Sequence, residues 1–353
     1  MNLKFIRSVF LQFSTIVGAG IFTLPYLFYS SNYYFAVIGL IIIALITVII
    51  NLFYIDIVNA TATPHQLSGY AQIYLGRRFK ILAAFNLLLI CIGSIFAYNY
   101  LASHFLTVFF PTLNFRLISF LFLFLVMIIY LISKKKPLTL FDFFPVLVIF
   151  ISLLLFSLSL DFPIPSLNLR SPNLAFVGAT IFALSGFTII PELEKRYLFN
   201  ASTIGLFLAT LLYVIFTYAV ITLSGSFLSA DTISGINHAS PLLASIVAIF
   251  GILITFKGSL NMLAVFYDIF HRDFNLHSSI STLLTLFISF VTVAILKLTL
   301  SDTISLLGSI TVSTAILIIC FIRLKLPQTN LTKITVYSVI VIFSLLLFAT
   351  LFM

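Results

Sequence analysis

Two short motifs place a glycine and a proline at the same spacing inside long apolar runs. Residues 20–25 read GIFTLP and residues 186–191 read GFTIIP, so the proline follows the glycine by five positions in both. Proline lacks a backbone N–H and clashes with the carbonyl four residues before it, while glycine weakens a helix by about 1 kcal/mol relative to alanine. The motifs therefore predict helices that are interrupted at these points, which frees the carbonyl groups of Ile21 and Phe187.

Interrupted helices can bind charged groups with their backbone alone. A helix that begins near Gly20 directs its first N–H groups and the positive end of its dipole at an anion. Gly18 and Ala19 let that anion approach the backbone closely. A helix that ends before Gly186 offers its last carbonyl groups to a cation. Together the two ends match the carboxylate and the ammonium group of a zwitterion such as an α-amino acid.

The residues of the two interruptions form the predicted substrate-binding site. They are Ile16, Val17, Gly18, Ala19, Gly20 and Ile21 in the first, and Phe182, Ala183, Leu184, Ser185, Gly186 and Phe187 in the second. Their apolar side chains suit a hydrophobic or aromatic substrate, although almost every residue nearby is apolar. Phe187 is either an aromatic gate or an ordinary core residue, and each interruption taken alone is also compatible with a structural kink.

The composition indicates which class of protein contains these motifs. The chain is 62% hydrophobic and 8% charged, and apolar runs of 18 or more residues recur along its 353 residues. Such runs are typical of transmembrane helices, and a soluble domain is never this apolar. The alternating segments of a membrane β-barrel are absent. We therefore predict an all-α polytopic membrane protein, with Cys91 and Cys320 as packing residues and no metal or cofactor.

Eleven spans account for the apolar runs. They cover residues 5–29, 33–58, 80–110, 115–132, 140–160, 174–191, 201–225, 241–267, 278–297, 302–322 and 333–352. The first run has the basic start of a signal peptide, but it continues to Tyr29 and ten further spans follow, so we expect no cleavage.

The basic residues predict the orientation of these spans. With the N-terminus in the cytoplasm, cytoplasmic segments hold 14 Lys and Arg residues, and the outer segments hold only Arg116, Arg170 and Lys297. This bias predicts a cytoplasmic N-terminus and an outer C-terminus in the cell membrane. It also explains the net charge of +9 without nucleic acid as a partner.

The two motifs lie five spans apart, so the helices that carry them run in opposite directions. Interrupted helices at matching positions of two inverted halves are the best sequence indication of a transporter's binding site. We therefore divide the chain into a first repeat at residues 1–160, a second repeat at 161–322 and an additional helix at 323–353.

The motifs resemble those of a known transporter superfamily. VGAGIFTLPY is similar to the first-helix motif of amino-acid permeases in the amino acid–polyamine–organocation superfamily, and FALSGFTIIPE is similar to their sixth-helix motif. The eleven-span layout is closest to the aromatic amino-acid and amino acid/auxin permeases. The resemblance implies a LeuT-type fold and secondary active transport of a neutral, hydrophobic or aromatic amino acid. It also implies substrate contacts on the third span, where Ser94 and Tyr98 lie one turn apart.

Lys257 is the one Lys or Arg residue that lies deep inside a predicted span, away from its ends. Lys257, Asn261, Ala264 and Asp268 share one helical face that leads from mid-membrane to the cytoplasm. That stripe predicts a water-filled exit path, or else a lysine that extends along the same face to reach water. Folds related by the resemblance hold a sodium ion between spans 1 and 8.

Lys257 lies in span 8 near the depth of that sodium site, with Thr255 and Ser259 as its neighbours. We therefore expect its ammonium group to take the place of the sodium ion. We therefore predict transport that is proton-coupled or uncoupled, without sodium dependence, since burial lowers the pKa of a lysine and lets it release a proton.

The longest connection, residues 59–79, contains His65 and a predicted short amphipathic helix near residues 66–75. It is either a plain connector or part of a cytoplasmic gate.

Other functions remain open or are disfavoured by missing motifs. No phosphate loop of an ATP-driven pump and no protease motif is present, and we expect no enzyme activity. A permease-fold nutrient receptor that binds an amino acid without sustained transport is the main alternative. A carrier of another small solute is the second, although a polyamine would require carboxylates that the two motifs lack. The oligomeric state stays undetermined.

Overall fold

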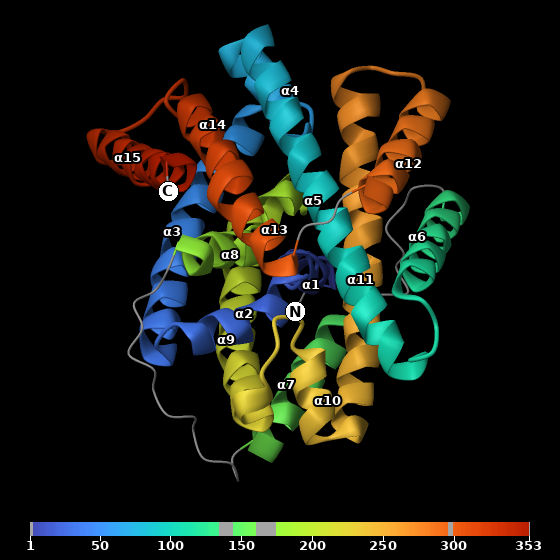
Figure 1. The fold of residues 1–353 in the computed structure, drawn as a ribbon. Coiled ribbons are helices and arrows are strands. Elements are labelled where there is room, and N and C mark those ends of the chain that lie inside the picture. Colours follow the sequence, from blue (N-terminus) through green and yellow to red (C-terminus); the bar gives the residue numbers. More distant parts are fainter. Residues whose placement is uncertain (1–2, 134–143, 160–173, 296–298, 353) are drawn as a thin grey trace.

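A computed structural model describes residues 3–133, 144–159, 174–295 and 299–352 (Figure 1). The α-helices are α1 (Leu3–Ile16), α2 (Gly20–Ser30), α3 (Tyr33–Ala60), α4 (Leu67–Leu75), α5 (Arg77–Phe109), α6 (Phe115–Ile132), α7 (Phe144–Ser159), α8 (Leu174–Leu184), α9 (Leu198–Ser224), α10 (Ile233–Ala239), α11 (Pro241–Asp268), α12 (Ser278–Ile295), α13 (Leu300–Leu306), α14 (Ser313–Arg323) and α15 (Asn330–Phe352). Short 3₁₀ segments are η2 (Phe187–Glu192), η3 (Lys195–Tyr197) and η4 (Gly225–Phe227), and π-helical segments are η5 (Ile269–Asp273) and η6 (Leu307–Val312).

The described helices match the predicted spans. Nine of them are long and apolar enough to cross a membrane, and the bent pair of α1 and α2 makes a tenth. The 16-residue helix α7 lies inside the fifth predicted span. The prediction of an all-α polytopic membrane protein with about eleven spans is therefore confirmed. Lys134, Lys135, Lys136, Arg170 and Lys297, which contribute to the predicted orientation, fall outside the described residues.

Local capping signals explain where several helices begin. The side chain of Asn32 accepts a hydrogen bond from the N–H of Tyr34 before α3, and Asn114 does the same for Arg116 before α6. Ser240 caps α11, which has Pro241 in its first turn. Asparagine and serine satisfy N–H groups that have no helical partner, and proline at the first helical position has no N–H to lose.

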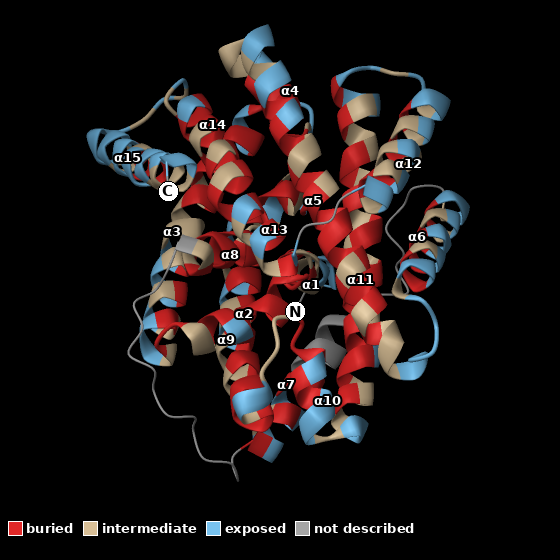
Figure 2. Cartoon of the chain, in the orientation of Figure 1, coloured by how far each residue is buried: buried red, intermediate tan, exposed pale blue. Residues whose placement is uncertain are grey.

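The helices divide into a buried core and an outer layer. In the most apolar stretch of α5, 67% of the residues are buried inside the protein, whereas the value for α15 is 17% (Figure 2). Helix α5 packs mainly against α11, and α1 packs mainly against α9. The exposed apolar faces of α6, α12 and α15 have the composition required to meet lipid tails.

Two glycines allow a close approach of helical segments. A Cβ on Gly308 would overlap the carbonyl oxygen of Gly178, so α8 and η6 approach each other backbone to backbone. This contact packs η6 against α8, the helix that leads into the second motif.

The connection between α3 and α5 folds as expected, because α4 covers Leu67–Leu75 within the predicted range. The buried carboxylate of Asp273 accepts a hydrogen bond from Ser68 in the first turn of α4, and Nδ1 of His65 lies 3.6 Å from its other oxygen. These contacts fix α4 to η5, at the opposite end of the molecule from α10 (Figure 1).

Candidate functional site

Both predicted interruptions are present. Helix α1 ends at Ile16 and α2 begins at Gly20, and the two helices are bent by 53°. Helix α8 ends at Leu184, and the chain continues from Phe187 as the 3₁₀ segment η2. Below, the first break means residues 17–19 and the second break means residues 185–186. The predicted helix interruptions at both motifs are therefore confirmed.

The glycines of the two motifs pack each break against the other. A Cβ on Gly20 would lie 2.5 Å from the Cβ of Ala183, and a Cβ on Gly186 would lie 2.5 Å from Cγ1 of Ile16. The space beside these glycines is therefore filled by the opposite motif. The sequence suggested that the glycines admit a ligand. Their immediate role in the structure is to let the two broken segments of the chain pack against each other.

A small cavity of about 30 Å³ lies between the two breaks. That volume is enough for roughly one water molecule, so the site is contracted in this conformation. Its walls are Thr15, Ile16, Gly18, Ala19, Gly20, Ile90, Ser94, Tyr98, Phe182, Ala183, Ser185, Phe187, Thr188 and Met262. Most of the predicted site residues are in this set, including Ser94 and Tyr98 of α5.

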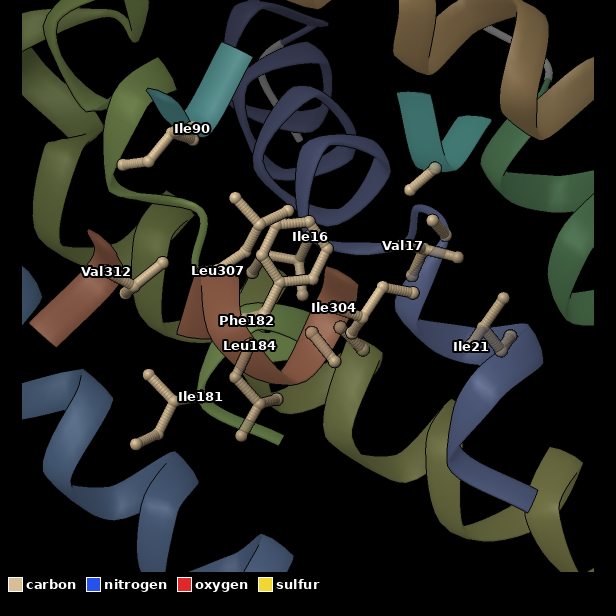
Figure 3. Packing of buried hydrophobic residues seen from close by; sticks show 14 of the residues in the cluster. Ile16, Val17, Ile21, Ile90, Ile181, Phe182, Leu184, Ile304, Leu307 and Val312 are labelled. Carbon is tan, nitrogen blue, oxygen red and sulfur yellow. The ribbon is translucent and has the colours of Figure 1, made fainter. Parts of the chain in front are cut away.

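Four predicted residues lie outside the cavity wall, namely Val17, Ile21, Leu184 and Gly186. Figure 3 shows the first three within the surrounding apolar cluster, to which Ile16 and Phe182 also belong. Successive residues of a helix point in different directions, so a contiguous motif cannot place every side chain in one cavity. Two further wall residues, Thr15 and Thr188, flank the breaks and were recognisable from the motifs. Ile90 and Met262 come from other helices, so only the folded structure shows that they line the cavity.

Tyr98 is held between the first break and α11. Its hydroxyl is hydrogen-bonded to the backbone of Ala19. A Cβ on Gly18 would lie 2.5 Å from the Tyr98 hydroxyl oxygen, and a Cβ on Gly258 would lie 2.5 Å from its ring. Two glycines therefore make room for this tyrosine, and its polar end reaches the backbone where α2 begins.

Tyr213 of α9, which the sequence analysis did not single out, contacts both motifs. Its hydroxyl oxygen lies 2.8 Å from the carbonyl oxygen of Ile16 and 2.9 Å from that of Ala183. Tyr213 is fully buried. One tyrosine among 15 carries no sequence signal for this position.

Gln12 of α1 forms a second link between the two motifs. Its Nε2 donates a hydrogen bond of 3.3 Å to the carbonyl of Gly186. The side chain is fully buried, and its Oε1 has no hydrogen-bond partner in the described part of the chain. An amide inside an apolar helix was a recognisable signal, because buried polar groups normally serve a specific partner.

A larger cleft of about 690 Å³ leads toward the cavity from the end of the molecule that holds α4. Thr15, Thr188 and Met262 line both the cleft and the cavity, so the two spaces adjoin. Its outer rim is charged. Arg272 lies 2.9 Å from Glu192 and 3.2 Å from Asp268, and Lys4 lies 3.7 Å from Glu194.

Only part of the predicted polar stripe on α11 lines the cleft. Asn261, Ala264 and Asp268 line the cleft, whereas Lys257 is half-buried and lies outside its wall. The Thr255 hydroxyl bonds the carbonyl groups of Gly251 and Ile252 within its own helix. Ser259 is buried. Within the described residues, no group of His, Cys, Asp and Glu side chains has the makeup of a metal site.

Aromatic rings close the other end of the molecule, on the α10 side of the cavity. The ring of Phe22 packs against Phe105, Phe216 and Phe250 at centroid distances of 4.7, 5.8 and 6.4 Å. The hydroxyl of Thr232, the residue before α10, donates to the carbonyl of Phe22. The structure is therefore open toward one end and packed shut toward the other.

A sequence model of the tryptophan/tyrosine permease family matches residues 1–191. No curated protein sequence matches the chain at a significant level. Solved structures that are similar include the Eremococcus coleocola manganese transporter in complex with an aromatic bis-isothiourea compound, with a TM-score of 0.75 and 14% identity over 98% of this chain and 85% of that one. MhsT in complex with L-phenylalanine has a TM-score of 0.65 and 13% identity over 99% and 97%.

Mhp1, a nucleobase-cation-symport-1 family transporter in a closed conformation with bromovinylhydantoin bound, has a TM-score of 0.59 and 14% identity over 90% of this chain and 77% of that one. At such low identities these likenesses concern the fold. They support the expected LeuT-type fold over nearly the whole chain.

Proposed function

Because the chain belongs to the tryptophan/tyrosine permease family, we propose that this membrane transporter carries aromatic amino acids by alternating access. One observation carries the proposal. The ends of two interrupted helices converge on a single cavity that adjoins a cleft from one end of the molecule and is packed shut toward the other. A carrier needs such a site, reached from one side at a time.

The backbone supplies the charged contacts of the proposed site. The N–H groups at the start of α2, near Gly20, receive the substrate carboxylate, and the hydroxyl of Tyr98 lies beside them. The carbonyl groups at the end of α8, around Ala183, receive the ammonium group. Phe182, Phe187 and the other apolar residues of the site surround the aromatic side chain.

The proposed transport cycle moves the two predicted repeats, residues 1–160 and 161–322, relative to each other, with residues 323–353 as an added helix. With the N-terminus in the cytoplasm, the cleft faces inward and the aromatic cluster closes the outer path. An aromatic amino acid is several times larger than a cavity of about 30 Å³, so binding requires the breaks to separate.

The proposed energy source is a proton gradient, or transport is uncoupled, and sodium has no part. Lys257 is the group that releases and takes up the proton. Thr255 uses its hydroxyl within its own helix, which leaves fewer oxygen ligands for a sodium ion beside Lys257. The stripe formed by Asn261, Ala264 and Asp268 provides the polar wall of the exit path.

Uptake of radiolabelled L-tryptophan, L-tyrosine and L-phenylalanine into proteoliposomes tests the proposal. We expect accumulation of at least one of them under an inward proton gradient, and competition by the other two. Binding without any entry or exchange of the labelled amino acid would instead identify a nutrient receptor built on the same fold. Binding of none of the three would reject aromatic amino acids as the substrates.

Imposed ion gradients test the coupling. At clamped pH and membrane potential, an inward sodium gradient is expected to leave uptake unchanged, and stimulation by sodium would reject that part of the proposal. Lys257→Met is expected to abolish accumulation driven by pH. A Lys257→Met protein that still accumulates substrate on a pH gradient alone would remove Lys257 from the mechanism.

A further inference from the structure

The hydroxyl of Tyr213 joins the last carbonyl groups of two different helices. Ile16 is the last residue of α1, and Ala183 is the second-last residue of α8. Their carbonyl oxygens lie 2.8 and 2.9 Å from the same hydroxyl oxygen. Carbonyl groups at the C-terminal end of a helix carry the negative end of its dipole. Three electron-rich oxygen atoms therefore meet at one point in the interior of the protein.

The backbone of Gly18 is hydrogen-bonded to the tyrosine hydroxyl, but the two carbonyl oxygens share only the single proton of that hydroxyl. A tyrosine hydroxyl has a single proton, so it can serve only one of the two carbonyl groups at a time, whereas each carbonyl oxygen has two lone pairs. An ammonium group brings three N–H donors and a positive charge, and hydrogen bonds to charged groups are the stronger kind. The group of oxygens is therefore chemically matched to a cationic donor.

Both residues that carry these carbonyl groups border the cavity between the breaks. Ile16 and Ala183 both line the cavity between the breaks, whereas Tyr213 does not. Tyr213 reaches the two carbonyl groups from α9, where it is fully buried. One lone pair of each carbonyl oxygen can then accept from the tyrosine, while the other remains for a ligand in the cavity.

We propose that Tyr213 is the positioning residue for the ammonium group of the substrate. This inference rests on the proposed function and adds a residue to it. The hydroxyl holds the carbonyl ends of α1 and α8 at a fixed separation, so both oxygens point at one ligand nitrogen. Tyr213 thus acts on the ammonium group through the two carbonyl groups, with no contact of its own with the substrate.

The test compares ligands with and without an ammonium group on three forms of the full-length protein. These are the wild type, Tyr213→Phe and the matched control Tyr218→Phe, which loses a hydroxyl from the same helix α9. Dissociation constants are measured in detergent for L-tryptophan and for indole-3-propionate, which keeps the ring and the carboxylate but lacks the amine.

For Tyr213→Phe we expect the affinity for L-tryptophan to fall about 10- to 100-fold, the range of a hydrogen bond to a charged group. The affinity for indole-3-propionate should stay within about twofold of the wild type, so the preference for the amine shrinks. Tyr218→Phe should keep the wild-type values for both ligands.

Two results would overturn the inference. Equal weakening of both ligands by Tyr213→Phe would show that the tyrosine merely supports the fold, and unchanged affinity for L-tryptophan would show that its hydroxyl positions nothing. The proposed function fails in a different way. In that case the wild type itself binds neither ligand, and the ammonium site proposed for Tyr213 is rejected with it.

Discussion

The two breaks have the same sequence pattern but differ in what surrounds them. At the first break, Gly20 meets the Cβ and the Cα of Ala183, which is mostly rigid backbone. At the second break, Gly186 meets Cγ1 of Ile16 and Nε2 of Gln12, which belong to side chains. Backbone cannot move without displacing a helix, whereas side chains can change rotamer. Matched motifs therefore predict two breaks, but they do not predict how well each break tolerates a substitution of its glycine.

Gly20→Ala is expected to have the largest effect of the changes at the breaks. The added Cβ would lie 2.5 Å from the Cβ and 2.8 Å from the Cα of Ala183, so α2 and α8 must separate. Overpacking of this kind costs about 1–3 kcal/mol. We expect a clearly lower melting temperature in detergent and almost complete loss of uptake. Ala183→Gly in the same chain should restore part of both, and wild-type stability of the single variant would contradict the packing described here.

Gly186→Ala should be milder than Gly20→Ala. The new Cβ would be 2.5 Å from Cγ1 of Ile16 and 2.8 Å from Nε2 of Gln12, and both side chains can yield at a cost of about 1 kcal/mol. We expect partial uptake and a smaller fall in melting temperature. If Gly186→Ala proves more damaging than Gly20→Ala, the contrast between backbone and side-chain neighbours is wrong.

Gln12→Met tests the side-chain hydrogen bond that joins α1 to the second break. The change keeps the length of the side chain but removes the donor to the Gly186 carbonyl, while it also removes a buried Oε1 that has no described partner. The two effects oppose each other, so we expect a loss of about 1 kcal/mol or less in unfolding free energy. Equilibrium unfolding in denaturant measures it. A loss as large as that of Gly20→Ala would show that this link, and not glycine packing, holds the breaks together.

Thr232→Gly should have the smallest effect, although it acts on the first motif. Thr232 has a φ of 66°, which is strained for a β-branched residue, and its hydroxyl donates to the Phe22 carbonyl. Glycine relieves the strain but loses the hydrogen bond, so the two terms roughly cancel. Thr232→Ala loses the bond without relieving the strain, and it should be the less stable of the two variants by about 1 kcal/mol. Equal melting temperatures for the pair would mean that the backbone here is unstrained.

The sequence was a good guide to elements whose signal is local. Hydropathy placed the spans, because long apolar runs must form helices in lipid. The amphipathic pattern near residues 66–75 separately predicted α4 within the longest connection. The Gly–Pro motifs predicted both breaks to within a few residues, although each break lies at or just before the glycine and the helical segments continue through Pro25 and Pro191. The helical period also placed Asn261, Ala264 and Asp268 on one face, and all three line the cleft.

Contacts between distant elements were decided by the tertiary structure alone. Tyr213 lies 197 positions from Ile16 in the chain, and Gln12 lies 174 positions from Gly186. No local pattern distinguishes Tyr213 from the other tyrosines, and the amide of Gln12 inside an apolar helix signals a buried partner without saying which one. The neighbours of Gly20 and Gly186 are likewise set by how the two motifs meet. Local chemistry therefore determined where the chain breaks, whereas only packing decided which groups satisfy the exposed backbone there, since each such group arrives from another helix.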